Sequence, residues 1–312
     1  MIISASRRTD IPAFYAPWFV NRLRAGYCTV PNPFNHQQVR RISLLPEDVD
    51  VIVFWTRSAR PLIPYLDELD ECGYRYYFQY TLLAYPQPLD PGVPSLAVGL
   101  DTIRALAEKI GPRRVIWRYD PIAFTDLTPP DYHRQQYERL AKQLAGYTQR
   151  SVISLMTLYP KIRKRLHAIA PYGAALQPPA TYGRDWFQAE WFPGLMRDLV
   201  AIAQNHKIQV TSCAMEKDLT QYGVRPGKCI DDTYIASEFG LEVSHNKDPG
   251  QRPACGCVIS RDIGMYDTCL FGCPYCYATR SFEHARINHT AHMVDSPSMI
   301  GRYEAVDRDL SA

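Results

Sequence analysis

Three cysteines near the end of the chain are the residues best suited to chemistry. They lie in the segment Cys269-Leu270-Phe271-Gly272-Cys273-Pro274-Tyr275-Cys276, separated by three and then by two residues. In a reducing compartment such crowding indicates a metal or redox site and not disulfides. Three thiolates neither close a tetrahedral zinc site nor ligate every iron of a [4Fe-4S] cluster. The spacing therefore predicts a cluster with one iron open to a small molecule.

This segment resembles the signature of the radical S-adenosylmethionine (SAM) superfamily, C-x3-C-x2-C with an aromatic residue before the third cysteine, here Tyr275. The resemblance implies a [4Fe-4S] cluster on Cys269, Cys273 and Cys276. In that superfamily the open iron chelates SAM, and an electron from the cluster cleaves it to a 5′-deoxyadenosyl radical. An external electron donor is also implied, whereas the substrate stays unknown.

The position of the motif departs from the superfamily, in which the cysteines usually follow the first strand of the barrel. Here they begin at residue 269 of 312. The chain resembles, over its full length, a bacterial family of unknown function that carries such a cysteine cluster at its C-terminus. That resemblance implies a type of chemistry but no substrate.

Four further cysteines precede the motif, at Cys213, Cys229, Cys255 and Cys257. Their number and their position in or next to one cysteine-rich segment predict a second metal site. An auxiliary [4Fe-4S] cluster and a structural zinc ion both suit four thiolates. Ordinary buried or free cysteines are the alternative, because a Cys-x-Cys pair alone is common.

Short apolar runs, each followed by a stretch with helical spacing, organise most of the chain. Six such units predict a parallel sheet, since every crossover returns the chain to the same edge. The radical SAM resemblance implies a six-unit partial (β/α) barrel of TIM-like type, and an open flavodoxin-like sheet is the alternative. Residues 28–48 are expected to be irregular. The predicted strands are residues 2–6, 50–55, 74–82, 114–119, 151–156 and 208–214.

Composition changes after the sixth strand and suggests three regions. Residues 1–214 are predicted to form the barrel. Residues 215–285 are rich in Gly, Pro, Asp and Cys and predict an iron–sulfur cap, in which only 231–239 has a helical pattern. A metal can replace a hydrophobic core in such a segment. Residues 286–312 are expected to be a polar tail.

The carboxyl ends of the predicted strands carry polar residues, and sites in α/β folds lie at these ends. A SAM carboxylate needs a cation, and its ammonium and ribose need acceptors. Bracing of the strand ends and capping of helices are the competing roles for such residues. No residue is assigned to catalysis on the substrate. The predicted SAM-binding residues are Arg7, Arg8, Asp10, Arg57, Arg118, Asp120 and Glu216, with Tyr275 against the cluster or adenine.

Composition excludes little. The 312 residues are 46% hydrophobic with a net charge of +3, which neither shows nor excludes contact with nucleic acid. No signal peptide pattern and no apolar stretch of membrane-spanning length is evident, so a cytoplasmic protein without a membrane partner is expected. The alternative to an enzyme is a non-catalytic binding protein stapled by zinc or an iron–sulfur cluster, associated with nucleic acid through its mild positive charge.

Overall fold

A computed structural model describes residues 1–169 and 185–304, which form two compact units. The first contains Met1–Tyr76, Ser260–Leu270 and the residues from Ala278 on, and the second contains Tyr77–Ile259 and Phe271–Tyr277. The end of the predicted tail, 305–312, lies outside the described residues. The division predicted from composition, at residues 214 and 285, stays a prediction.

Parallel strands form the centre of the first unit, in the order β10-β1-β4. Their bounds are β1 (Ile2–Ala5), β4 (Val51–Thr56) and β10 (Arg261–Asp262). Every residue of β1 is buried, and so are five of the six in β4. Burial on both faces explains why these strands read as continuous apolar runs and not as alternating ones.

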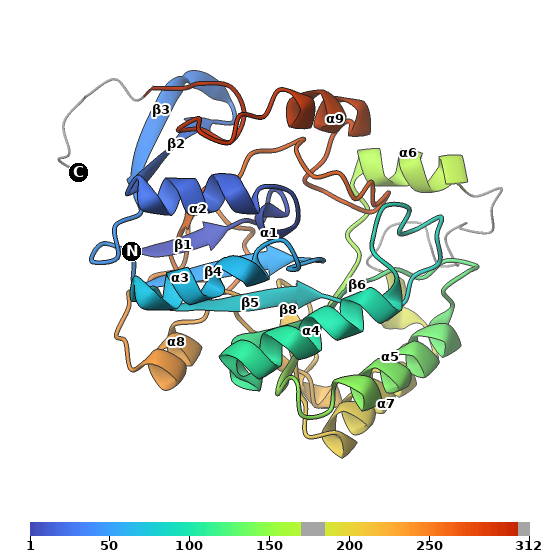
Figure 1. The fold of residues 1–312 in the computed structure, drawn as a ribbon. Coiled ribbons are helices and arrows are strands. Elements are labelled where there is room, and N and C mark those ends of the chain that lie inside the picture. The colour runs from blue at the N-terminus through green and yellow to red at the C-terminus, as the bar shows by residue number, and fades with distance from the viewer. Residues whose placement is uncertain (170–184, 305–312) are drawn as a thin grey trace. The chain divides into compact units, whose positions relative to one another are not determined.

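The first unit also holds a β-hairpin where an irregular segment was predicted. Strands β2 (Tyr27–Asn32) and β3 (Asn35–Ser43) pair antiparallel, so the expectation for residues 28–48 was wrong. Six of the nine residues of β3 are exposed, which removed the alternation that reveals a half-buried strand. The helices of this unit are α1 (Ile11–Phe14), α2 (Ala16–Arg24), α3 (Leu66–Glu71), α9 (Phe282–Thr290) and the 3-10 turn η1 (Ile63–Tyr65) (Figure 1).

The second unit contains five parallel strands in the order β5-β6-β7-β8-β9. The chain is therefore an α/β protein with eight parallel strands among its described residues, and all six predicted strands are present. The sequence analysis missed β9 and β10, which span only three and two residues. The strands are β5 (Tyr76–Thr81), β6 (Val115–Ile122), β7 (Arg150–Leu155), β8 (Gln209–Cys213) and β9 (Arg225–Gly227).

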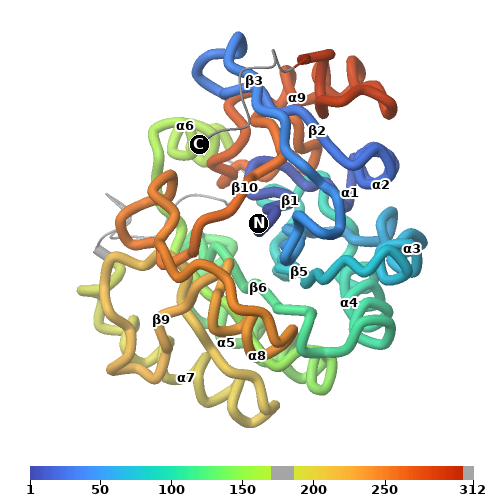
Figure 2. The backbone as a smooth tube through the Cα atoms, turned by 90° about the vertical axis from the view of Figure 1, so that its left-hand side faces the viewer, coloured from blue at the N-terminus to red at the C-terminus, as the bar shows by residue number. Residues whose placement is uncertain are grey.

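The long helices of the second unit gather on one face of its strands. Helix α5 lies beside both α4 and α7 (Figure 1), and Figure 2 shows these three helices next to one another from a second direction. Within the described residues, no helix is both long and apolar enough to cross a membrane. The helices are α4 (Leu96–Ile110), α5 (Pro130–Leu144), α6 (Pro160–Ile169), α7 (Phe192–Asn205) and α8 (Asp232–Phe239), with 3-10 turns η2 (Pro112–Arg114), η4 (Asp185–Gln188) and η5 (Thr220–Tyr222).

Candidate metal centre

Alternation along β6 separates two kinds of side chain. Trp117 and Tyr119 point towards α5, where Trp117 stacks on Tyr137 with ring centroids 4.7 Å apart. Arg118 and Asp120 point to the opposite face, because successive residues of a strand alternate. The register of the neighbouring strands extends this second face, which we call the inner face. Its polar residues include Gln79, Arg118, Asp120, Arg150, Ser154, Thr211 and Cys213.

Arg118 is the central cation of the inner face. It is buried and donates from Nη1 to Gln79 Oε1 at 3.1 Å and to Cys229 Sγ at 2.8 Å. Its Nη2 bonds to Asp120, whose other carboxylate oxygen accepts from Ser154. A buried guanidinium with carboxylate, amide and sulfur partners stays charged. The arginine and the aspartate predicted at the end of this strand are thus joined.

Cys213 and Cys229 meet beside Arg118. Their sulfur atoms lie 3.1 Å apart, with Cys213 at the end of β8 and Cys229 two residues after β9. The hydrogen bond with Cys229, helped by the charge of Arg118, lowers the pKa of Cys213 to about 7 although its burial opposes this. The same contact raises the pKa of Cys229 well above the ordinary value. Cys213 is therefore the thiol of the pair that ionises more readily.

The other two cysteines of the second set lie at the same place. The Cys257 sulfur accepts from the backbone N–H of Cys229 at 3.3 Å and from that of Ile230 at 3.4 Å. Contact with Cys257 also raises the pKa of the Cys229 and Cys255 thiols. Segments far apart in the sequence therefore converge, and we call Cys213, Cys229, Cys255 and Cys257 the four-thiol group.

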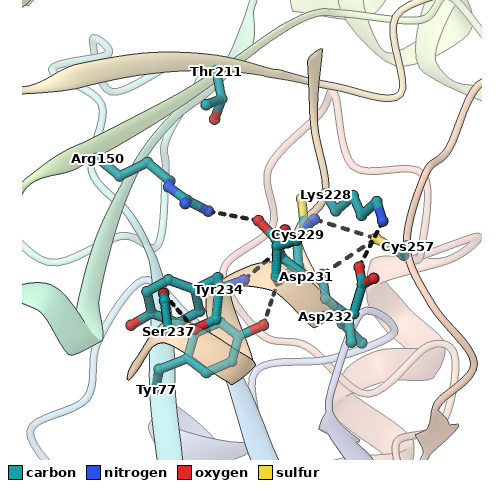
Figure 3. A network of polar contacts seen from close by, with 12 residues as sticks. Tyr77, Arg150, Thr211, Lys228, Cys229, Asp231, Asp232, Tyr234, Ser237 and Cys257 are labelled. Carbon is teal, nitrogen blue, oxygen red and sulfur yellow. Dashed lines mark hydrogen bonds and ion pairs between the residues drawn. The ribbon is translucent and has the colours of Figure 1, made fainter. Parts of the chain in front are cut away.

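Hydrogen bonds and an ion pair fix the backbone around Cys229 (Figure 3). Its carbonyl accepts from the Tyr77 hydroxyl at 2.7 Å and from Gln79 Nε2 at 2.8 Å. Asp231 caps α8 through the N–H of Tyr234 and pairs with Arg150 at 3.0 Å. These contacts fix the direction in which the loop after β9 presents its thiol.

An ion-paired cluster holds the start of α8 in addition. Asp232 accepts from Lys228 Nζ and from His245 Nδ1, both at 2.6 Å. These partners, acting against burial, lower the pKa of the Asp232 carboxyl. His245 is exposed and still anchors Asp232 through this contact. None of these anchors was predicted as a site residue, because their roles follow from three-dimensional contact and not from spacing.

The second half of the C-x3-C-x2-C motif is anchored in the second unit. The N–H of Gly92 donates to the Phe271 carbonyl at 3.0 Å, and the Tyr275 hydroxyl donates to Asp90. Both partners lie in the connection that follows β5. From α6, which follows β7, Arg165 Nη1 donates to the Cys276 carbonyl at 3.0 Å. Because connections after parallel strands lie at their carboxyl edge, the Cys273–Cys276 loop lies at that edge.

Cys273 is buried and Cys276 is half-buried in this loop. The N–H of Cys276 closes a turn onto the Cys273 carbonyl at 3.0 Å. Tyr275, predicted to contact the cluster or adenine, packs edge-on against Tyr85 at 5.7 Å. Its hydroxyl bond to Asp90 gives it an anchoring role. Asp90 carried no sequence signal that would have marked it.

Cys269, the first cysteine of the motif, belongs to the first unit. It is half-buried, and its electrostatic neighbour Tyr15 donates to the adjacent Thr268 carbonyl at 2.7 Å. Burial, and then Cys269, raise the pKa of Tyr15 above its usual range.

The first unit brings four of the predicted SAM-binding residues to the ends of its strands. Asp10 accepts from the N–H of Ala13, from Thr56 Oγ1 at 2.7 Å and from the N–H of Arg57 at 2.6 Å. Burial raises the pKa of Asp10 to about 7 despite these bonds. Asp10 therefore joins the start of α1 to the end of β4, which is the bracing role foreseen for such a residue.

The arginines after β1 differ in their surroundings. Arg8 donates to the Gly264 carbonyl at 3.2 Å and lies over the ring of Tyr266. The guanidinium of Arg7 lies over Trp55, 5.3 Å from the ring centroid. Arg57 provides the backbone contact to Asp10, and Glu216 in the second unit is exposed. Binding of SAM by these residues stays a prediction.

The four-thiol group fits a metal by donor type, but not in its present geometry. Among residues 1–169 and 185–304, no group of three or more His, Cys, Asp or Glu side chains is placed to hold a metal ion. The 3.1 Å between Cys213 and Cys229 is shorter than the distance of about 3.8 Å that two thiolates keep on one tetrahedral zinc with bonds of about 2.3 Å. Metal binding therefore requires one of the two thiols to turn away from the other.

Comparison with known families matches residues 2–278 to the model described as a domain of unknown function, DUF1848. The chain belongs to the DUF1848 family. All nine cysteines lie inside the matched range, so the four-thiol group and the C-x3-C-x2-C motif are both part of the DUF1848 domain. Searches of curated proteins and of solved structures found no match.

Proposed function

We propose that this DUF1848 protein is a radical SAM-type enzyme that cleaves S-adenosylmethionine reductively, with an unknown substrate. Cys269, Cys273 and Cys276 would hold a [4Fe-4S] cluster with one open iron. When bound, that cluster would supply the single electron for cleavage of the SAM sulfonium, taken from an external donor. The observation that carries the proposal is the anchoring of the Cys273–Cys276 loop at the carboxyl edge of parallel strands.

The chain's own residues support this role at the loop. Tyr275 and Arg165 fix its backbone on two sides, so the direction of the Cys273 and Cys276 side chains is set before any ligand arrives. The short spacing to Cys269 keeps that thiol near by covalent connection alone. Preorganised ligands reduce the cost of binding a cluster. Three protein ligands leave one iron open to SAM.

The finer fold assignment belongs to the same proposal. A flavodoxin-like sheet carries helices on both faces, whereas a (β/α) barrel carries its helices only on the outside. The grouping of α4, α5 and α7 favours a six-unit partial barrel. Its interior would then provide the water-poor chamber that one-electron chemistry on SAM requires.

The decisive experiment is anaerobic. The protein is purified without oxygen, its iron and sulfide are counted, and the electron paramagnetic resonance spectrum of the reduced protein is recorded with and without SAM. We expect the spectrum to change on addition of SAM and 5′-deoxyadenosine to form slowly. Zinc in place of iron, or a spectrum indifferent to SAM, would instead support a non-catalytic metal-stapled binding protein.

Replacing Cys273 with Ala should abolish both the SAM-dependent spectral change and formation of 5′-deoxyadenosine, because the cluster loses one of three protein ligands. Cys72→Ala is the matched control, since Cys72 is exposed at the end of α3 and outside the motif. SAM cleavage at the wild-type rate in Cys273→Ala would refute the proposal.

A further inference from the structure

Helix α6 lies beside the second half of the C-x3-C-x2-C motif, and its exposed cations have no part in the proposed cleavage of SAM. We propose that α6 and Tyr277 form the docking surface for the external electron donor, and that this donor is a small acidic electron-carrier protein. The inference rests on the proposed function, because it names the partner that would reduce the [4Fe-4S] cluster. The helix, Cys276 and Tyr277 all belong to the second unit.

The side chains of α6 divide into a buried face and a charged face. Ile162 and Leu166, four residues apart, are buried. The cations of the helix are Lys161, Arg163, Lys164 and Arg165. Arg163 and Lys164 are exposed, and no residue of α6 is Asp or Glu. The helix itself therefore brings only positive charge to the surface.

Two of these cations reach the motif directly. Lys161 Nζ donates to the Tyr277 carbonyl, and Arg165 Nη1 donates to the Cys276 carbonyl at 3.0 Å. The helix is thus in contact with the backbone of the last proposed cluster ligand and of the residue after it. A partner seated on α6 would lie close to Cys276. The rate of electron transfer falls steeply with distance, so this position suits a donor.

The composition of the surface fits a transient protein partner. The Tyr277 side chain is 49% exposed and directly follows Cys276 in the chain. An aromatic residue at the centre with charged residues at the rim is typical of protein interfaces. Helix α6 has ten residues and is about 15 Å long, which suits the small interfaces of redox encounters, below about 1,200 Å². Its positive charge attracts and steers an acidic partner.

Nucleic acid is the other polyanion that a basic helix could attract. As the substrate it would have to reach the open iron, whereas α6 contacts the loop at Cys276, where the cluster would be covered by a protein ligand. Affinity for nucleic acid also comes from cations distributed over many phosphates, and a single ten-residue helix offers few such contacts. The position and size of the surface therefore favour an electron carrier.

The first test compares two reductants of different size. The probe for the carrier is chemically reduced flavodoxin, an acidic protein, and dithionite is the small reductant that needs no docking surface. In the double variant Arg163→Glu with Lys164→Glu, we expect 5′-deoxyadenosine formation driven by flavodoxin to fall about tenfold at low ionic strength. Formation driven by dithionite should stay at the wild-type rate. The milder variant Arg163→Gln with Lys164→Gln should give an intermediate loss with flavodoxin.

Arg139→Glu with Lys142→Glu is the matched control, because it makes the same change of charge at exposed residues of α5. These two residues lie in the second half of α5, which returns the chain to the amino ends of the strands. The control should keep the wild-type rate with both reductants. An equal loss in the control, an unchanged flavodoxin rate in the α6 variants, or a loss with dithionite as well would overturn the inference.

Binding of oxidised flavodoxin, measured by calorimetry without SAM, separates this inference from the proposed function. We expect the Kd to rise about tenfold in Arg163→Glu with Lys164→Glu, and to rise in the wild type as salt is added. No binding to the wild type would overturn the inference. So would single-stranded DNA that binds instead of flavodoxin and is released by the same substitutions. Absence of SAM cleavage even with dithionite would count against the proposed function alone.

Discussion

The outer and inner faces of strands β5 to β8 share one backbone but differ in what their side chains contact. On the outer face, Trp117 and Tyr119 of β6 pack against Tyr137 and His133 of α5. On the inner face, the guanidinium of Arg118 hydrogen-bonds to the thiol of Cys229, the carboxylate of Asp120 and the side-chain amide of Gln79. Apolar contact stabilises a fold through burial alone, whereas a buried arginine destabilises it unless the charge is paired and hydrogen-bonded, as that of Arg118 is. The contrast is the reason to place the candidate site on the inner face.

The two cysteine groups differ in a similar way. The four-thiol group lies within one unit and is held by side chains and amides distant in sequence. The C-x3-C-x2-C motif owes its proximity to eight consecutive residues. A local motif is marked by its spacing alone, whereas the number of cysteines suggested the second group and only the fold shows which of them meet. The predictions below test whether the outer face is concerned with stability and the inner face with metal.

Truncation of the outer face should have the largest effect on stability. Trp117→Ala removes a buried ring that stacks on Tyr137 and donates to the Leu82 carbonyl at 3.0 Å. Loss of a buried tryptophan costs about 3–5 kcal/mol of the free energy of unfolding. Denaturant unfolding followed by circular dichroism measures this change. Trp117→Phe keeps most of the ring contact and should cost clearly less.

Iron per folded chain should be unchanged in Trp117→Ala, because the side chain faces away from the thiols. Loss of iron from protein that is still folded would show that the two faces are coupled and would break the comparison.

His133 makes stability depend on pH through the outer face. It accepts from the Tyr119 hydroxyl at Nδ1 and donates from Nε2 to the Ala123 carbonyl, at 2.9 and 3.0 Å. Burial lowers its pKa from 6.5 to about 4, although the backbone contacts oppose this. Between pH 6.5 and about 4, the imidazole of His133 is protonated in the unfolded chain but stays neutral in the folded protein. Stability should therefore be complete above pH 6.5 and fall by about 3 kcal/mol as the pH drops towards 4, with no further loss from this group below that.

Unfolding curves between pH 7 and pH 4 measure this loss, and His133→Gln serves as the comparison because its side chain does not titrate. The variant should be less stable at pH 7 and lose less stability on acidification than the wild type. Identical pH slopes for the two proteins would show that His133 does not titrate as its burial indicates.

Strands buried on both faces were predictable because an apolar run needs no knowledge of its neighbours; Val51–Thr56 is an example. The hairpin strand Asn35–Ser43 was not, since its exposed polar residues carry no pattern. At the site, spacing marked the C-x3-C-x2-C motif, the number of further cysteines marked the second set, and the strand-end position of Arg118 and Asp120 marked these two residues. Asp90 and Arg165 gave no signal, because they act through contacts with residues distant in sequence.

The smallest expected change in the free energy of unfolding comes from the inner face. It tests whether the amino and carboxyl halves of this face have different roles. Near the amino ends of the strands, Arg150 pairs with Asp231, which also caps α8. Asp231→Ala removes the cap and the ion pair and should cost about 1 kcal/mol, within the range of lost N-caps. Asp231→Asn keeps a capping oxygen and loses only the charge, so it should cost less.

Iron content should be unaffected in both Asp231 variants, because Tyr77 and Gln79 hold the Cys229 carbonyl independently of the cap. That result would confine the metal function of the inner face to its carboxyl half, where Arg118, Asp120 and Cys213 lie, and assign the amino half to stability. Iron lost from Asp231→Ala without a change in unfolding would instead mean that α8 orients the thiols, and that the whole inner face is a single functional surface.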